Sequence, residues 1–252
     1  MSLPDAFLRT PLAHRALHGP GRPENSLAAV RAAVAAGYGI EVDVQPSADR
    51  AAMVFHDYSL DRLTDETGPV AQRSAAELAA TPLKGDAEGI PTLSQVLSTV
   101  GGKVPVLIEI KDQDGAMGPD IGSLQAWVAE ALTGYRGPVA VMSFNPHTVA
   151  AMAKLAPKVP RGLTTSGWDH GNALQLPAEA RAHLAAIEDF DRVGACFISH
   201  DWHNLTNPRV ADLKAHGVPI LCWTIQSAAE ESQAREIPDN ITFEHYAADH
   251  PA

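Results

Sequence analysis

Hydrophobic residues in this chain occur in short runs that alternate with longer, Ala-rich segments in which apolar positions recur every three or four residues. Short apolar runs favour strands, and the longer periodic segments favour helices. Strands are expected at residues 11–17, 40–44, 104–110, 138–144, 161–165, 195–199, 218–224 and 240–244. Helices are expected at residues 24–37, 92–100, 121–133, 146–155, 178–190, 208–216 and 228–237.

This alternation predicts the topology. Strands that alternate with helices pair in parallel and are joined by right-handed crossovers. Eight such units in roughly 250 residues match the size of a closed (β/α)8 barrel, the TIM barrel. The predicted fold class is therefore α/β, with residues 1–252 forming a single TIM-barrel domain.

A further strand-like run, residues 51–57, does not fit a simple barrel. Only the segment QPSADR separates it from the second strand, whereas a parallel crossover needs about a dozen residues or more. The two runs are therefore expected to form an antiparallel β-hairpin that brings His56 back toward Glu41 and Asp43. Residues 46–90 are then an inserted hairpin and small subdomain over the barrel mouth, between the second and third barrel strands.

Composition and charge exclude several kinds of partner. The chain is 45% hydrophobic, enough for a sizeable core, and its formal net charge of -11 argues against a nucleic-acid-binding protein. No apolar run is long enough for an integral membrane segment, and the first residues lack the features of a secretory signal. A cytoplasmic protein is expected. Two cysteines, Cys196 and Cys222, form no disulfide framework.

Polar side chains gather where the predicted strands end. Glu41 and Asp43 alternate with apolar residues, so both carboxylates lie on one face of the second strand, about 7 Å apart. Catalytic groups of TIM barrels sit at the C-terminal ends of the strands. The other candidates at these ends are His14, Arg15, Glu109, Lys111, Ser143, Phe144 and Trp223, with His56 arriving by the hairpin.

The chemistry of these groups suggests a metal-assisted reaction on a phosphate. Glu41, Asp43 and Glu109 would repel one another in a low-dielectric pocket unless a cation neutralised them, and oxygen ligands suit Mg²⁺ or Ca²⁺. The alternative is that each acid is a buried salt-bridge partner of Arg15 or Lys111. Paired histidines suggest a general acid and a general base, and fixed positive charge beside them suits a phosphate.

Five short motifs occur in one order along the chain: His14-Arg15, Glu24-Asn25, Glu41-x-Asp43, His56-Asp57 and Glu109-x-Lys111. With this order, the chain resembles the glycerophosphodiester phosphodiesterase (GDPD) family, most closely between Leu12 and Lys111. The resemblance implies a TIM barrel with an insertion between its second and third strands. It also implies hydrolysis of a glycerophosphodiester to glycerol 3-phosphate and an alcohol, a reaction of lipid and glycerol metabolism that uses a divalent cation.

The resemblance further implies a role for individual residues. His14 and His56 would be the acid-base pair, Glu41, Asp43 and Glu109 the metal ligands, Arg15 and Lys111 the phosphate-binding residues, and Phe144 and Trp223 the lining of the glycerol or alcohol side. Glu24 and Asn25 are expected to brace the first loop. Asn25 is also expected to cap the following helix, although Ser26 can do so as well.

The chain departs from the family pattern at two places. Ala16 stands where the family usually has Gly, and Ala tolerates a positive φ poorly. The closing segment AADHPA offers Asp249 and Pro251 without the family's Thr, which leaves a role for Asp249 open. The polar and aromatic segment 199–207 either reads the alcohol or is an ordinary rim loop.

Other activities also fit a barrel of this kind. A sphingomyelinase D-like or other phosphodiesterase would share the fold and the histidine pair. A glycoside hydrolase would use Glu41 and Glu109 as acid and nucleophile, but would leave Arg15 and Lys111 without a role. A non-catalytic phosphodiester-binding barrel is a third alternative. The substrate alcohol, the choice between Mg²⁺ and Ca²⁺, and the oligomeric state stay open.

Overall fold

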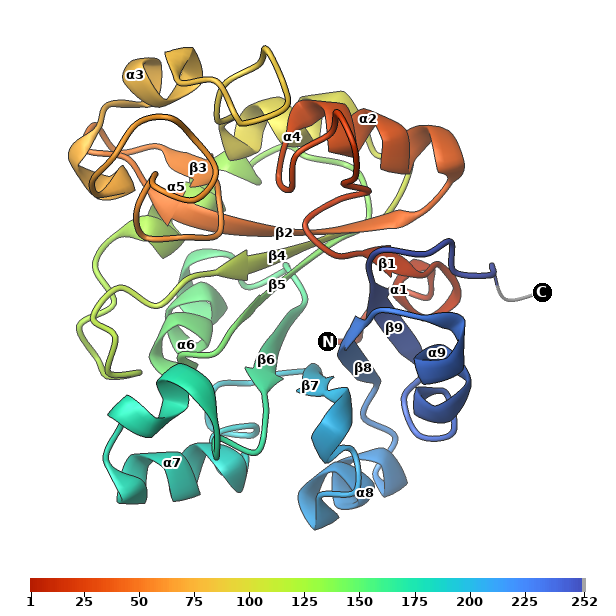
Figure 1. The fold of residues 1–252 in the computed structure, drawn as a ribbon. Helices are drawn as coiled ribbons and strands as arrows, with labels where there is room; N and C mark the ends of the chain where they lie inside the picture. Colours follow the sequence, from red (N-terminus) through yellow and green to blue (C-terminus); the bar gives the residue numbers. More distant parts are fainter. Residues whose placement is uncertain (251–252) are drawn as a thin grey trace.

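The computed structural model describes residues 1–250 of the chain and shows a closed barrel (Figure 1). Among these residues, nine strands form one sheet in the order β1-β9-β8-β7-β6-β5-β4-β2-β3, and β1 also pairs with β2, which closes the ring. The parallel strands are β1 (Leu12–Ala13), β2 (Gly39–Pro46), β4 (Val106–Ile110), β5 (Val139–Ser143), β6 (Arg161–Thr165), β7 (Phe197–Asp201), β8 (Ile220–Ile225) and β9 (Asn240–Phe243). The predicted (β/α)8 fold class is confirmed.

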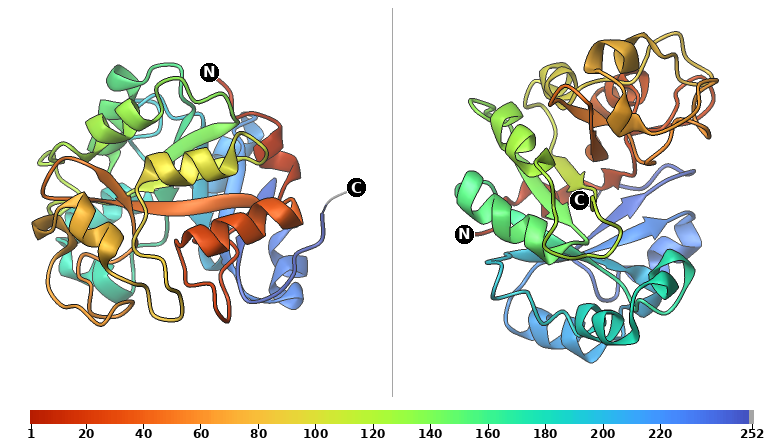
Figure 2. Two further views of the ribbon diagram at one scale, coloured as in Figure 1. Left: turned by 90° about the horizontal axis from the view of Figure 1, so that it is seen from above. Right: turned by 90° about the vertical axis from the view of Figure 1, so that its left-hand side faces the viewer.

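Helices surround the barrel between successive strands (Figure 2). Their bounds are α1 (Ala6–Arg9), α2 (Leu27–Ala36), α3 (Ala75–Ala80), α4 (Leu93–Val100), α5 (Leu124–Ala131), α6 (Pro146–Leu155), α7 (Ala178–Ala185), α8 (Pro208–Ala215) and α9 (Ala228–Ala234). Three short 3₁₀ helices lie between these elements: η1 (Val70–Gln72), η2 (Gly171–Gln175) and η3 (Trp202–Asn204). The helices predicted at 121–133, 178–190 and 228–237 are therefore shorter than expected.

The first strand is much shorter than the predicted 11–17, for a local reason. After Ala13 the backbone leaves the extended region, because Arg15 and Ala16 have φ angles of 50° and 63°. A strand cannot continue through residues in this left-handed region. The chain instead turns at the barrel rim directly after its two paired residues.

The second strand explains how one sheet serves both core and site. Ile40, Val42 and Val44 pack with α2 residues such as Val30 in a cluster outside the barrel. The alternate residues, Glu41 and Asp43, therefore face the barrel interior. Below them the interior is filled by a separate apolar cluster that includes Leu107, Met142, Phe197 and Leu221, and Phe7 of α1 belongs to it as well.

The predicted antiparallel hairpin is present. Strand β3 (Ala52–Val54) pairs antiparallel with β2, with Val44 opposite Val54, and it is shorter than the predicted 51–57. The segment that follows contains η1 and α3 and has an apolar cluster of its own, formed by Met53, Phe55, Leu60, Val70, Leu78, Leu83 and Ile90. The insertion therefore has an apolar centre separate from that of the barrel.

Helix α2 corrects one expectation about the first loop. Its N-cap is Ser26, whose hydroxyl accepts a hydrogen bond from the Ala29 N–H, and Gly37 ends it with a φ of 77°. Asn25 is not the cap. It has a φ of 59° and its side chain turns toward Asp43 instead. Asn tolerates this left-handed conformation better than most residues do, which suits it to the position.

The structure also bears on membrane-spanning segments and on the two cysteines. Within residues 1–250, no helix is both long and apolar enough to cross a membrane. Cys196 and Cys222 are both free thiols, the first partly buried and the second buried. Burial raises the pKa of the Cys222 thiol to about 12, so this cysteine is a core residue.

Candidate active site

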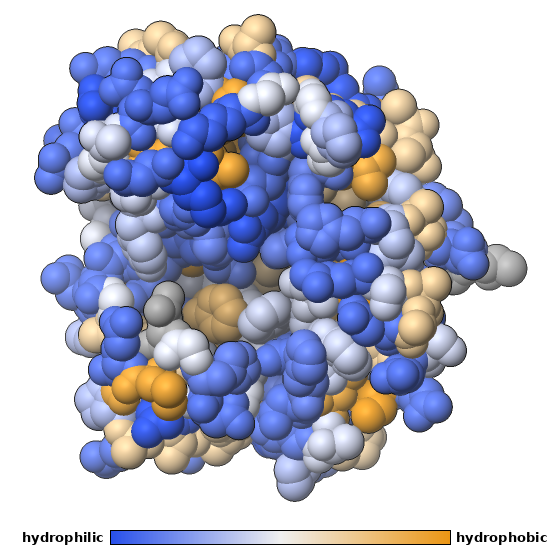
Figure 3. All heavy atoms as spheres, viewed as in Figure 1, coloured by the Kyte–Doolittle hydropathy of each residue, from blue (hydrophilic) through white to orange (hydrophobic). Residues whose placement is uncertain are grey.

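A cavity of about 120 Å³ opens at the C-terminal ends of the strands, and all nine predicted site residues line it. On the surface it lies in a hollow whose upper rim is hydrophilic (Figure 3). The lining residues are His14, Arg15, Glu41, Asp43, His56, Glu109, Lys111, Met142, Phe144, Trp223, Thr224 and Thr242. Residues from widely separated segments thus meet in one pocket, as the barrel topology predicted.

Three acids form the floor of the pocket. Ligand oxygens of Glu41, Asp43 and Glu109 lie within 4.8 Å of one another, and Asp43 is directly opposite Glu109 in the β2–β4 register. Burial, followed by the charges of Asp43 and Glu109, raises the pKa of Glu41 well above its ordinary value. The floor therefore holds more negative charge than it can easily accommodate.

Lys111 lies among these acids. Its Nζ is 2.7 Å from Asp43 Oδ1 and 2.5 Å from Glu109 Oε1. Burial would lower the pKa of Lys111, but the two carboxylates raise it above its ordinary value, so the ammonium is charged. The salt-bridge alternative thus describes the contacts of Lys111 in this structure, while its predicted contact with phosphate stays a prediction.

Arg15 approaches the same acids from the first loop. Its backbone N–H donates to Glu41 Oε2 at 2.9 Å, and its Nε lies 3.5 Å from Asp43 Oδ2. That Nε is buried and has no hydrogen-bond partner among the described residues. A buried donor without a partner is costly, so this N–H is available to an incoming acceptor.

The left-handed backbone at Arg15 and Ala16 is fixed by contacts with β2. The Ala16 N–H donates to the Glu41 backbone oxygen at 2.9 Å, and Ala16 is only 1% exposed. A non-glycine residue in this conformation costs about 1–2 kcal/mol. The family's usual Gly at this place would avoid that cost, and here the loop keeps its shape through its hydrogen bonds.

Glu24 and Asn25 brace this loop, as expected. Asn25 Nδ2 donates to Asp43 Oδ2 at 3.0 Å, and its Oδ1 accepts from the Asp43 N–H at 3.2 Å. Glu24 accepts from Arg15 Nη1 at 2.8 Å and also from both terminal nitrogens of Arg62, at 2.8 Å each. Arg62 belongs to the insertion, so Glu24 ties the first loop to the insertion.

Each of the two histidines has a carboxylate partner. His14 Nδ1 donates to Glu244 Oε2 at 2.7 Å, and its Nε2 lies 4.0 Å from Glu41 Oε2. His56 Nδ1 donates to Asp57 Oδ1 at 2.7 Å. In both cases the bond fixes the ring and leaves Nε2 as the atom free to exchange a proton.

The charges around His56 extend into the insertion. Burial is the main cause that lowers the pKa of His56, so it is neutral near pH 7. Arg62 donates to Asp57 from Nε at 2.6 Å and from Nη2 at 2.9 Å. Although burial opposes the change, Arg62 and His56 lower the pKa of Asp57 to about 2.

Three residues around the site, Glu244, Arg62 and His18, were not predicted from the sequence. Burial would raise the pKa of Glu244, but hydrogen bonds from His14 and His18 hold it well below its ordinary value. Glu244 follows β9 directly, so its place at a strand end was a usable indication. Asp249, which the sequence left open, is exposed and is not among the lining residues.

The opposite wall is aromatic. The Phe144 ring packs edge-on against Trp223 and Trp168, with centroids 5.5 Å and 5.6 Å away. Trp223 Nε1 donates to the Ser199 backbone oxygen at 2.9 Å. Residues 199–201 end β7, residues 202–204 form η3, and none of residues 199–207 is among the lining residues. This segment supports the wall through the Ser199 backbone oxygen, and a role in reading the alcohol stays a prediction.

Comparison with known proteins identifies the family. The model of the glycerophosphoryl diester phosphodiesterase family matches residues 14–240. The chain belongs to this family. It is therefore an enzyme that hydrolyses glycerophosphodiesters, which confirms the family and the enzyme class predicted from the sequence.

Individual relatives agree over nearly the whole chain. YhdW of Bacillus subtilis is 29% identical over 242 residues, covering 92% of this chain and 93% of that protein. A glycerophosphodiester phosphodiesterase of Caldanaerobacter subterraneus is 28% identical over 213 residues, covering 81% and 80%. A phosphodiesterase of Oleispira antarctica, solved with the product sn-glycerol-3-phosphate, has a TM-score of 0.78 at 24% identity and covers 95% and 94%. At that identity the likeness supports the fold alone.

Proposed function

We propose that this enzyme hydrolyses glycerophosphodiesters to glycerol 3-phosphate and an alcohol by acid-base catalysis between His14 and His56, with a divalent cation at the acidic floor. The observation that supports this most directly is the meeting of both histidines and all three acids in one cavity. A small-molecule substrate suits that cavity.

Glu41, Asp43 and Glu109 would hold the cation. Three buried carboxylates offer oxygen ligands only, which suits Mg²⁺ or Ca²⁺. Burial, followed by the charges of Asp43 and Glu109, raises the pKa of Glu41 well above its ordinary value, and a dication at this place would offset the repulsion among the three acids. A bound dication supplies a Lewis acid that polarises a phosphoryl oxygen.

The chain's own residues supply positioning and proton transfer. Arg15 offers its unpartnered Nε–H to a phosphoryl oxygen, and the Lys111 ammonium adds fixed positive charge beside it. One histidine accepts a proton from the nucleophile, and the other protonates the leaving oxygen. Glu244 and Asp57 hold the two rings so that each Nε2 is the exchanging atom.

The aromatic wall of the pocket, opposite the acids, suits the organic part of the substrate. Phe144 and Trp223 present ring surface to the glycerol or the alcohol. Residues 46–90 are proposed to act as the cover of the mouth, since they contribute His56 and bind the first loop through Arg62 and Glu24. We propose a cytoplasmic location for this activity.

The test uses the full chain with glycerophosphocholine, glycerophosphoethanolamine and glycerophosphoinositol. Activity should be lost in chelator and restored by Mg²⁺ or Ca²⁺. His14→Ala and His56→Ala, assayed on a diester with a good leaving group, should each lower the rate at least about 100-fold. His216→Ala serves as the control because His216 is exposed at the end of α8. Full activity in chelator, or two active histidine variants, would refute the proposal.

A further inference from the structure

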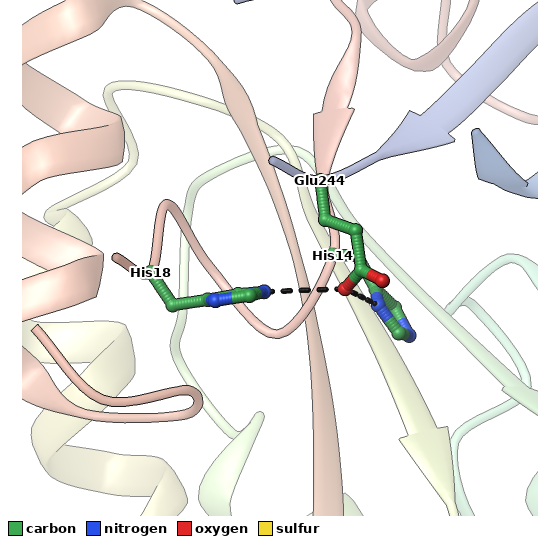
Figure 4. A group of neighbouring side chains, drawn as sticks. All are labelled: His14, His18 and Glu244. Carbon is green, nitrogen blue, oxygen red and sulfur yellow. Dashed lines mark hydrogen bonds and ion pairs between the residues drawn. The ribbon is translucent and has the colours of Figure 1, made fainter. Parts of the chain in front are cut away.

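A second group of potential metal ligands lies beside the acidic floor. His14 Nδ1 is 2.7 Å and His18 Nε2 is 3.2 Å from the same oxygen, Glu244 Oε2. Figure 4 shows the two rings approaching that oxygen from different sides. All three ligand atoms lie within 4.8 Å of one another, and the side chains are only 12–17% exposed. Hydrolysis as proposed above gives His18 no task.

We propose that His14, His18 and Glu244 form an inhibitory binding site for a dication that prefers nitrogen ligands, with Zn²⁺ the best match. Zinc binds imidazole nitrogen at about 2.0–2.1 Å and carboxylate oxygen at about 2.0–2.2 Å in tetrahedral geometry. Tetrahedral bonds of that length place the ligand atoms roughly 3.3–3.5 Å apart. The two separations from Glu244 Oε2, 2.7 Å and 3.2 Å, are shorter than this, and all three ligand atoms lie within 4.8 Å of one another. Side-chain shifts on the order of 1 Å would therefore bring them to tetrahedral spacing.

The Glu244 carboxylate is also held through its second oxygen, Oε1. Gln226 Nε2 donates to Glu244 Oε1 at 2.7 Å, and His245 Nε2 lies 3.3 Å from that same oxygen. These contacts use Oε1 and leave Oε2 directed at the two histidines. Partners of this kind, which orient a ligand without touching the metal, are a regular part of metal sites.

The two sites differ in the ions that they favour. The floor of Glu41, Asp43 and Glu109 offers oxygen alone, which suits hard ions. Two imidazoles with one carboxylate suit zinc and leave a fourth position for water. Saturating the floor with Mg²⁺ or Ca²⁺ should therefore leave the second site open to Zn²⁺.

Inhibition follows from the position of His14 between the two sites. Its Nδ1 faces Glu244, while its Nε2 lies 4.0 Å from Glu41. A zinc ion at Nδ1 needs the lone pair there, so the ring proton moves to Nε2. With zinc on Nδ1 and its one proton on Nε2, His14 cannot accept a further proton as a base, and as an acid it could release that proton only by becoming an imidazolate. This step rests on the proposed catalytic role of His14, whereas zinc binding itself does not.

The experiment measures Zn²⁺ binding and activity with the full chain in saturating Mg²⁺ and again in saturating Ca²⁺. Isothermal titration calorimetry gives the affinity, and visible absorption of Co²⁺ in place of Zn²⁺ reports imidazole coordination. His18→Gln keeps a donor for Glu244 but removes one ligand. We expect it to bind Zn²⁺ at least about ten-fold more weakly, to require at least about ten-fold more Zn²⁺ for inhibition, and to keep its activity without zinc.

His216→Gln is the matched control, since His216 is an exposed histidine at the end of α8 and should leave zinc binding unchanged. His18→Asn, together with thermal unfolding of each variant, separates loss of the site from loss of the fold. Equal Zn²⁺ affinity in wild type, His18→Gln and His18→Asn would overturn the site. Zinc bound through His18 with full activity would support the site and count against the catalytic role of His14.

Discussion

The two walls of the candidate active-site cavity are built differently. The charged wall, which includes the acidic floor, comes from the residues that follow β1, from β2, from β4 with the residue after it, and from the hairpin. It presents His14, Arg15, Glu41, Asp43, His56, Glu109 and Lys111. The other comes from β5 and β8 and presents Met142, Phe144 and Trp223. The charged wall suits reaction at a phosphate, and the aromatic wall suits recognition of the organic groups attached to it.

The walls also differ in how strongly their members depend on one another. Asp43, for example, contacts three side chains, those of Lys111, Asn25 and Arg15. Removing a charged partner leaves the buried Asp43 carboxylate with less compensating charge. Phe144 and Trp223 meet through ring contacts and one hydrogen bond to backbone. Substitution in the charged wall should therefore be much more damaging than substitution in the aromatic wall.

The largest effect is expected at Lys111. Lys111→Met leaves Asp43 and Glu109 without their buried cation, so stability should fall by about 3–5 kcal/mol and kcat/KM by at least about 100-fold. Urea unfolding and steady-state kinetics measure both. Mg²⁺ or Ca²⁺ should raise the Tm of the variant more than that of wild type, because the acids then lack another counter-charge. Lys154→Met, at an exposed site, is the control; equal stability of both variants would contradict the comparison.

A smaller effect is expected at Arg62, which binds Asp57 beside His56 within the insertion and also Glu24 in the first loop. Arg62→Ala removes the donors to Asp57 and Glu24, so the orientation of His56 and Arg15 loosens. We expect kcat to fall about ten-fold with little change in KM. Arg62→Lys should retain only part of the wild-type kcat, because an ammonium cannot donate to Asp57 and Glu24 with the geometry of the planar guanidinium.

Arg73, also in the insertion, binds Glu66 rather than the loop residues. Arg73→Ala should therefore leave kcat unchanged. A loss of equal size in both variants would mean that the insertion acts through its stability and not through Arg62.

The aromatic wall should respond in KM. Phe144→Ala removes an apolar surface of the cavity, which we expect to raise KM about ten-fold while kcat and metal dependence change little. Phe144→Leu should lie between the variant and wild type. A fall in kcat with unchanged KM would place Phe144 with the charged wall and remove the distinction.

The smallest effect is a pH dependence of stability at Glu244. Its pKa is below the ordinary value of 4.5 in the folded chain, so its stabilising contribution is complete above about pH 4.5 and is lost as the pH falls further. Glu244→Gln lacks that contribution. The Tm curves of wild type and variant should therefore converge between about pH 5 and pH 2, and parallel curves would contradict this reading.

The features that could be predicted from the sequence are those set by neighbouring residues in the chain. The period-two alternation at residues 40–44, the position of strand ends and, for His56, the short segment that forces a hairpin were enough to place the nine candidate residues at one mouth. The order of the motifs was enough to recognise the family. Both depend on the position of each residue within its own strand and on general rules for barrels.

What the sequence did not reveal depends on which distant side chains meet. Asn25 and Ser26 both suit a helix cap. Asn25 instead has a positive φ, its N–H donates to the Arg15 backbone oxygen at 2.8 Å, and its side chain binds Asp43, and these contacts depend on the folded first loop. Arg62 is one of many charged residues in the insertion until the hairpin brings it to Glu24 and Asp57. Lys111 follows Glu109 by two residues, but its approach to both acids depends on the β2–β4 register.

Closure of the ring through β1 and β9 has a consequence for biosynthesis. His14 is among the first residues of the site to leave the ribosome, while its partner Glu244 follows 230 positions later. Domains are completed from the N-terminus during synthesis. A nascent chain that still lacks β9 and Glu244 thus has neither a closed cylinder nor an oriented His14, so hydrolytic competence is expected only after that segment has been synthesised.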